Sequence, residues 1–194
     1  MDIRKSTVAA LAACVLALAA VSARARTEPK PAQKPQPRVS SERLEKSIHA
    51  LVNRERAAKG LRPLAWDAKL AAIARGHSGD MGRRNYFAHV TPEGANFDAR
   101  YAKARYKCFV PVGDVVHGGA ENIARDDLWA KITMLGDRKY YDWHSEDELA
   151  RRTVAGWMKS PGHRANILTP HWQHEGLGVT VTRDLKVYVT EDFC

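Results

Sequence analysis

Three polar side chains in separate stretches of the sequence are the first candidates for chemistry: His89 in YFAHV, Glu121 in GAENIA and His163 in SPGHR. Two imidazoles and one carboxylate can bind Zn²⁺ while leaving one coordination position open. The same groups can carry out general acid–base chemistry, because histidine titrates near neutral pH. No compact metal motif such as H-E-x-x-H is present, so spacing alone does not bring the three residues together. A hydrogen-bonded polar cluster that closes a cleft is the alternative interpretation.

Ser160 and His77 are weaker candidates for chemistry. Ser160 lies near His163 and would suit a nucleophile, but no third orienting residue is identifiable, and capping of the following helix explains it more simply. His77 falls on the apolar side of a predicted helix, where a buried, hydrogen-bonded histidine is expected rather than a ligand. Ser78 follows it directly and points about 100° away, so these two residues cannot form a dyad.

The remaining histidines and two asparagines are assigned structural or surface positions. His117 precedes two glycines and is expected in a solvated loop, with the mouth of a cavity as the alternative. Asn122 and Asn166 are expected to tie loops to the backbone. Three further histidines are predicted to lie at the surface: His144, His171 and His174.

Two helices are predicted in the first half of the chain. The spacing of apolar residues predicts a helix over 41–60, with Ser41 as its cap and Gly60 in the left-handed position that ends it. A second helix is predicted from Asp67, which is a good N-cap residue, to about Arg84.

Two more helices are predicted in the second half. Ser145 begins the first of them and forms a capping-box pair with Glu148. A short helix is then predicted to begin at Pro161, capped by Ser160, because proline suits the first turn of a helix.

The segments between and after these helices predict a mixed architecture. Residues 85–101 are expected to form a loop, and 104–124 to be irregular and partly extended. The aromatic-rich stretch 125–144 is expected to rim the cavity as a binding loop, or to pack as a lid. Valines alternate with threonines on both sides of a turn at Arg183-Asp184, which predicts a terminal β-hairpin. The fold class is therefore α+β, as a three-layer α-β-α sandwich with a central antiparallel sheet.

The N-terminal residues are predicted to direct export rather than to join the fold. A basic start, an apolar run over 7–21 and small residues after it indicate a signal peptide over 1–25, and the run is shorter than the roughly 20 residues of a spanning helix. A lipid anchor at Cys14 is the alternative. Residues 26–40 are rich in proline and basic residues and are expected to form an extended tether, leaving 41–194 as the domain. These features predict a secreted or periplasmic protein with no transmembrane segment in its mature form.

The two cysteines that would remain after cleavage, Cys108 and Cys194, predict one disulfide, because export leads to an oxidising compartment. Two free thiols are the alternative.

The chain is basic, with a formal net charge of +9, and loss of the signal peptide lowers that charge by only two. Such an exported protein tends to adhere to anionic polymers or lipid headgroups. No zinc-finger spacing, helix-turn-helix or aromatic RNA-binding strand is found, so nucleic acid is not an expected partner.

Three phrases in order resemble the CAP superfamily, which includes cysteine-rich secretory proteins, venom antigen 5 proteins and plant pathogenesis-related proteins. The first is NRERAAKGLRPLAWDAKLAAIARGHSGDM at 53–81, continuing into NYFAHVTPEG at 85–94. The second is GAENIA at 119–124, and the third is GWMKSPGHRANIL at 156–168, followed by GLGV at 176–179. The similarity is strongest to the bacterial branch and extends over roughly residues 44–194.

This resemblance implies a cavity lined by two histidines and two glutamates. His89 matches the first histidine, Glu121 the first glutamate and His163 the second histidine. Ser160 stands near the place where the family has its second glutamate. This replacement argues against any activity that needs four ligating groups. Ser160 and Asn122 are included with the three matched residues as predicted cavity residues.

The resemblance and the residues together predict a non-catalytic binding module. Its cavity is expected to take a divalent metal such as Zn²⁺, a lipid or a cell-envelope ligand, with no cofactor required. The alternative is a metal-assisted, protease-like hydrolase in which His89, Glu121 and His163 activate a water molecule. A third hypothesis is adhesion to the cell envelope through the basic tether at 26–40.

Overall fold

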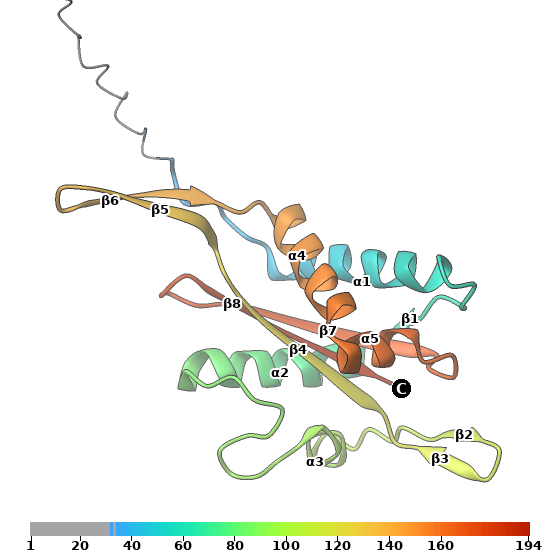
Figure 1. Ribbon diagram of the computed structural model, residues 1–194. Coiled ribbons are helices and arrows are strands. Elements are labelled where there is room, and N and C mark those ends of the chain that lie inside the picture. Colours follow the sequence, from blue (N-terminus) through green and yellow to red (C-terminus); the bar gives the residue numbers. More distant parts are fainter. Residues whose placement is uncertain (1–31, 33) are drawn as a thin grey trace, which may run out of the picture. The chain divides into compact units, whose positions relative to one another are not determined.

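The computed structural model of the protein describes residue 32 and residues 34–194. The predicted signal peptide, Cys14 and the first part of the predicted tether lie outside the described residues, so those assignments stay predictions. Within the described residues, no helix is both long and apolar enough to cross a bilayer. The elements follow the order α1 (Ser41–Ala57), β1 (Ala65–Trp66), α2 (Ala68–Arg84), α3 (Phe97–Lys103), β2 (Val110–Val112), β3 (Val115–His117), β4 (Ala120–Asp127), β5 (Trp129–Leu135), β6 (Arg138–Trp143), α4 (Glu146–Lys159), α5 (Pro161–Leu168), β7 (His174–Val181) and β8 (Lys186–Phe193) (Figure 1).

A four-stranded sheet forms the middle layer of the fold, in the order β1-β7-β8-β4. Helix α2 packs against one face of this sheet, and α1, α4 and α5 lie on the other, which confirms the predicted α-β-α sandwich (Figure 1). Strands β4, β8 and β7 are antiparallel neighbours, as predicted. The short β1 runs parallel to β7, however, so the sheet is mixed rather than wholly antiparallel.

Two glycines of β7 allow α2 to approach the sheet closely. A Cβ atom on Gly176 would lie 2.1 Å from the backbone nitrogen of Ala71, and one on Gly178 would lie 2.0 Å from that of Arg75. No side chain fits in that space, so the GLGV phrase is a packing requirement of the α2–sheet interface.

The main core lies between the sheet and the helices α1 and α4. Leu44, Ile48 and Val52 form the buried stripe of α1, and Trp157 is the largest fully buried side chain of α4. Full burial of each such side chain stabilises the fold by about 1.5–3 kcal/mol, so this layer contributes much of the folding free energy.

The capping signals in the sequence are largely confirmed. The side chain of Asp67 accepts hydrogen bonds from two backbone N–H groups in the first turn of α2. Ser145 and Glu148 form the predicted capping box at the start of α4. The predicted cap at Ser41 is wrong by one residue: Ser40 has the extended backbone of an N-cap, and its hydroxyl accepts the capping hydrogen bond, whereas Ser41 is already helical.

Two segments predicted to be irregular contain regular structure. The last part of the predicted 85–101 loop belongs to α3, which Asn96 caps. The stretch 125–144, predicted to be a loop or lid, completes β4 and then forms the β5–β6 hairpin. Glu121 stands at the start of β4, about 20 Å from the strand's last residue, because an extended chain rises about 3.3 Å per residue. The β5–β6 hairpin follows that last residue and therefore does not rim the predicted cavity.

The disulfide predicted between Cys108 and Cys194 is present, with the two Cα atoms 5.5 Å apart. It joins the segment before β2 to the residue after β8. The backbone N–H and C=O of Cys194 also bond to the backbone of His174, so the last strand is fixed at its end by both covalent and hydrogen bonds.

Candidate functional site

Strand β4 is an edge of the sheet and carries Glu121 and Asn122 on opposite faces, because successive residues of a strand point in opposite directions. Glu121 pairs with Asp192 of β8 and faces the α2 side, whereas Asn122 pairs with Glu191 and faces α5. Gly119 leads into the strand with a φ of 120°, and a Cβ atom there would lie 2.8 Å from the carbonyl oxygen of Phe193. Glycine at this position therefore sets how the GAENIA phrase enters the sheet.

The carboxylate of Glu121 is almost fully buried, and both of its oxygens are hydrogen-bonded. Oε1 accepts from Nδ1 of His89 at 2.8 Å, and Oε2 accepts from Nη2 of Arg100. The other terminal nitrogen of Arg100 donates to the carbonyl oxygen of His89 at 3.1 Å. Arg100 thus both neutralises the buried carboxylate and fixes the backbone that carries His89.

His89 and His163 reach the same place from opposite faces of the sheet. The loop after α2 carries His89, and α5 carries His163, and their ring centroids are 6.2 Å apart. The side chain of His89 is 49% exposed, so the pair is open to solvent. Burial, and then the neighbouring His89, lower the pKa of His163, which favours its neutral, ligand-competent form at neutral pH. The structure therefore brings the three predicted residues His89, Glu121 and His163 together.

Asn122 was predicted to line the cavity, but its side chain is fully buried and positions α5 instead. Its amide nitrogen donates to the carbonyl oxygen of His163 at 3.2 Å and to Oε2 of Glu191 at 2.9 Å. Its amide oxygen accepts from Asn166 at 2.9 Å, and Asn166 also donates to the carbonyl oxygen of Glu121 at 3.2 Å. These bonds bear out the expectation that both asparagines tie segments to the backbone.

Ser160 occupies the N-cap position of α5, but the predicted capping hydrogen bond is absent. The same residue ends α4, so it joins the two helices with an extended backbone. Within residues 34–194, its hydroxyl makes no hydrogen bond, and it is not among the contacts of Glu121 or the two histidines. The structure therefore does not bring Ser160 into the cluster.

The arrangement differs from the predicted three-ligand metal site. In the part of the chain that the structure describes, no group of three or more His, Cys, Asp or Glu side chains is arranged to hold a metal ion. Two imidazoles on a tetrahedral Zn²⁺ have centroids about 5 Å apart, so this pair would need to close by about 1 Å. After such a closure the two imidazoles would hold the cation, and Glu121 would stand behind His89 as the orienting carboxylate, a common arrangement around metal-binding histidines.

The other histidines take up varied positions. His77 is buried in α2 and hydrogen-bonded as predicted, with Nε2 3.0 Å from the carbonyl oxygen of Ala88. His117, predicted as a solvated loop residue, stacks on His171 with ring centroids 4.2 Å apart. His144 was predicted to be exposed but is buried, and its backbone N–H bonds to the carbonyl oxygen of Leu128.

Sequence reasoning missed three buried carboxyl groups and Arg100. Glu175, Glu191 and Asp192 are fully buried in β7 and β8. Burial is the first cause that raises their pKa values, and Glu175 reaches about 7. Alternation in a strand usually separates buried from exposed residues, but in this sandwich helices cover both faces of the sheet, so alternation does not indicate which carboxyl groups are buried. No feature of the sequence indicated a role for Arg100, because its segment was predicted to be a loop.

Comparison with known proteins places this geometry among related folds. The family model described as "Cysteine-rich secretory protein family" matches residues 49–193. Two proteins of Bacillus subtilis (strain 168) are similar to this chain. The uncharacterized protein YkwD is 34% identical over 135 residues, which cover 69% of this chain and 41% of YkwD. The uncharacterized membrane protein YlbC is 32% identical over 149 residues, which cover 77% of this chain and 34% of YlbC. The chain thus spans less than half the length of these relatives.

Solved structures agree with the family model. An extracellular protein with an SCP domain from Bacillus anthracis has a TM-score of 0.56 and 27% identity, over 79% of this chain and 40% of that one. An outer surface protein of Borrelia burgdorferi has a TM-score of 0.59 and 16% identity, over 82% and 97%, which shows the fold alone. The match over 49–193, carried by a sandwich of the same kind, shows that this chain belongs to the CAP, or cysteine-rich secretory protein, family.

Proposed function

We propose that this protein is an exported, non-catalytic binding module whose His89–His163 pair takes a divalent cation such as Zn²⁺. The observation that carries the proposal is that the two imidazole rings lie with their centroids 6.2 Å apart at an open position, with His89 held from behind by Glu121. The basic charge of the chain supports an anionic partner in the cell envelope, either a polymer or a lipid headgroup. The predicted signal peptide, together with the description of the B. anthracis neighbour as extracellular, supports export.

The support for a cation rests on how the pair is built. Hydrogen bonding through Nδ1 leaves Nε2 of His89 available, and the carboxylate makes the ring a stronger donor to a metal. The lowered pKa of His163 keeps its ring neutral at neutral pH. Two imidazoles held in this way leave further positions on a bound cation for an anionic group of the partner.

Thermal unfolding with and without Zn²⁺ tests this proposal. A ligand at about 100 times its Kd stabilises the folded state by about 2.7 kcal/mol. For a domain of this size that corresponds to a rise in Tm of roughly 5–10 °C. The substitutions His89→Ala and His163→Ala should each remove the rise.

Two control variants separate this pair from the other histidines. His174→Ala changes an exposed histidine of β7 and should keep the rise in Tm. His117→Ala removes one ring of the stacked His117–His171 pair, which is the other place where imidazoles meet. The proposal fails if Zn²⁺ has no effect on the unchanged protein, or if His117→Ala rather than His163→Ala removes the effect.

The hydrolase alternative has less support from the site. A general base needs a free oxygen directed at a water molecule, but each oxygen of Glu121 already accepts from His89 or Arg100. We therefore expect no Zn²⁺-dependent cleavage of peptide or ester libraries. Cleavage that disappears in His163→Ala would favour the hydrolase instead.

A further inference from the structure

The β2–β3 hairpin carries a cluster of exposed apolar side chains that the proposed cation site does not use. The hairpin lies beyond the start of β4, and neither of its strands has extensive contact with another helix or strand of the described chain (Figure 1). In it and directly before it, four large apolar side chains are exposed: Phe109, Val112, Val115 and Val116. Contiguous exposed apolar side chains on a folded domain commonly mark a contact surface for a partner.

Only the base of the hairpin is held against the body of the fold. Val110 is buried, and its partner in the strand pairing, His117, stacks on a neighbouring imidazole. Pro111 and Val116 are paired with each other and point to the opposite face, because side chains alternate between the two faces of a strand. Phe109 lies two residues before Pro111 and belongs to the same side. These three residues, Phe109, Pro111 and Val116, form the apolar face of the hairpin.

The apolar face continues into a hollow of about 760 Å³ at the base of the hairpin. Phe109 lines this hollow together with Gly118, which lies two residues after Val116. The hollow and the apolar face are therefore on the same side of the hairpin.

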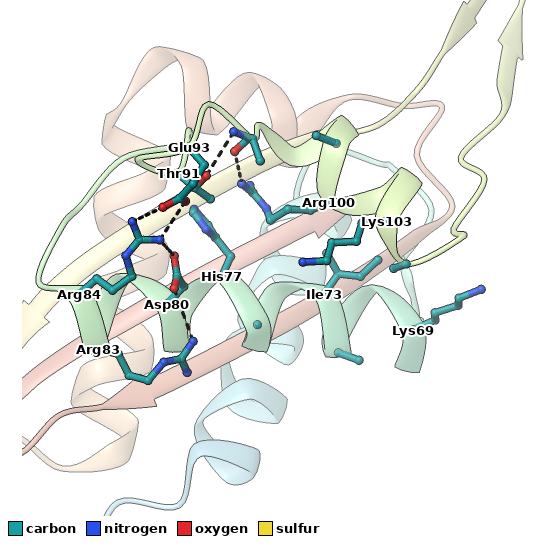
Figure 2. Close-up of a pocket in the computed structure, with 15 residues that line it drawn as sticks. Lys69, Ile73, His77, Asp80, Arg83, Arg84, Thr91, Glu93, Arg100 and Lys103 are labelled. Atoms are coloured by element: carbon teal, nitrogen blue, oxygen red, sulfur yellow. Dashed lines mark hydrogen bonds and ion pairs between the residues drawn. The ribbon is translucent and has the colours of Figure 1, made fainter.

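Cationic side chains lie beside the apolar face. Arg105 and Lys107 are exposed and line the hollow next to Phe109. The side chain of Lys69 extends away from the other labelled residues of the pocket between α2 and α3 (Figure 2), and its Nζ donates to the carbonyl oxygen of Arg105 at 2.9 Å. None of these three cations makes an ion pair within residues 34–194, and one carboxylate, that of Asp98, lines the hollow. The surface thus combines apolar side chains with an excess of unpaired positive charge.

An anionic lipid bilayer fits this combination better than a protein partner does. The four exposed apolar side chains present on the order of a few hundred Å². Each partner in a stable protein complex, a second copy of this chain included, buries about 800 Å². A bilayer requires no such area, because each apolar side chain that enters it strengthens the binding separately, and its anionic headgroups attract the neighbouring cations.

We propose that the β2–β3 hairpin docks this domain on an anionic lipid bilayer. The hairpin lies along the membrane surface with its apolar face in the interfacial layer, and Arg105 and Lys107 contact the headgroups. Asp114, in the turn at the tip, then stays at the level of the headgroups, where its charge weakens binding. The inference names a partner for the proposed function but relies on that proposal only for export, because neither histidine of the cation site belongs to the hairpin.

Co-sedimentation with large unilamellar vesicles tests the inference. The protein used is the form expected after export, residues 26–194, which lacks the apolar run over 7–21. Without added Zn²⁺, it should bind vesicles of about 30% phosphatidylglycerol in phosphatidylcholine at least about tenfold more strongly than vesicles of phosphatidylcholine alone. The double variant Phe109→Ser/Val116→Ser should weaken binding to the anionic vesicles at least about tenfold, and should stay folded because both side chains are exposed.

The other hairpin offers a matched control. Met134 and Leu135 of β5 are 56% and 48% exposed, so Met134→Ser/Leu135→Ser removes a similar amount of exposed apolar surface elsewhere on the molecule. This control should bind the anionic vesicles as the unchanged protein does. His163→Ala should also leave vesicle binding unchanged, so failure of the proposed cation site and failure of this inference are distinguishable.

The charges beside the apolar face are tested separately. Arg105→Gln/Lys107→Gln should weaken binding to the anionic vesicles by about tenfold, and Asp114→Asn should strengthen it by about two- to fivefold. The inference is overturned if the unchanged protein does not bind the anionic vesicles, or if Phe109→Ser/Val116→Ser binds them equally well. It is also overturned if light scattering shows a dimer that this double variant dissociates, because a second copy of the chain would then occupy the surface.

Discussion

Replacement of Glu175 by glutamine should make this protein more stable than the unchanged chain above neutral pH. Glu175 and Glu191 are fully buried on neighbouring strands, and Oε2 of Glu175 and Oε1 of Glu191 have no donor within the described residues. Nδ1 of His49 contacts the other oxygen of Glu175. A charge on Glu175 is therefore poorly compensated, and a neutral glutamine of the same shape removes that cost.

The magnitude follows from the pKa of Glu175, which burial raises from 4.5 to about 7. Below pH 4.5 the side chain is protonated in the folded and the unfolded states alike. Between these two pH values the folded state holds a proton that the unfolded state releases, so stability falls as the pH rises. A pKa difference of this size between the folded and unfolded states lowers the free energy of unfolding by roughly 3 kcal/mol at pH 7 and above. Glutamine does not titrate and avoids this loss.

Urea unfolding at pH 5 and pH 8 measures the effect. We expect Glu175→Gln to match the unchanged protein at pH 5, to within about 1 kcal/mol, and to exceed it by roughly 3 kcal/mol at pH 8. Glu42→Gln is the matched control, because Glu42 is exposed on α1 and pairs with Lys46. If the gap between Glu175→Gln and the unchanged protein is the same at both pH values, Glu175 does not titrate in this range and the reasoning is wrong.

Three further predictions concern packing, the buried ion pair and the disulfide. Gly178→Ala should destabilise the protein by about 3 kcal/mol or more in urea unfolding, because its Cβ atom would overlap the backbone of α2, whereas Gly156→Ala should stabilise it by about 0.5–1 kcal/mol. Arg100→Met should lower the free energy of unfolding by about 3–5 kcal/mol, because it leaves the carboxylate of Glu121 buried without its cation. The double variant Arg100→Met/Glu121→Gln should recover part of that stability. If it recovers none, Arg100 and Glu121 do not interact. Reduction of the Cys108–Cys194 disulfide should lower the free energy of unfolding by about 4–5 kcal/mol, and an unchanged Tm under reducing conditions would contradict this.

Local signals in the sequence predicted most of the helices and the terminal hairpin. Asp67 and the Ser145–Glu148 pair satisfy N–H groups within one turn, so their effect can be read without tertiary context. Helix α3 was missed because it has seven residues and a single buried side chain, Tyr101, too short a stretch for an apolar period to show. The sequence holds a turn signal for the β5–β6 hairpin in Gly136-Asp137, which the prediction of a binding loop or lid over 125–144 did not use.

The candidate site was only partly predictable. The meeting of His89, Glu121 and His163 followed from the family resemblance, because the elements that carry them come from both faces of the sheet. The anchoring of Glu121 by Arg100 depends on how α3 packs beside β4, which no pattern in one stretch of sequence indicates. Asn122 was predicted to be a cavity residue together with Glu121, but neighbouring residues of a strand point to opposite faces, so its side chain lies on the other side of the sheet.

Side chains from α4 and α5 also cover the free edge of the sheet. Asn166 donates to the carbonyl oxygen of Glu121, and Nε1 of Trp157 donates to that of Ile123 at 3.0 Å. An uncovered edge strand offers such carbonyls to a strand of another molecule, which is a common route to aggregation. Asn166, which ties α5 to β4, therefore also helps to keep copies of this chain from pairing through β4. Variants at Asn166 should be examined for self-association before any change in binding is assigned to the site.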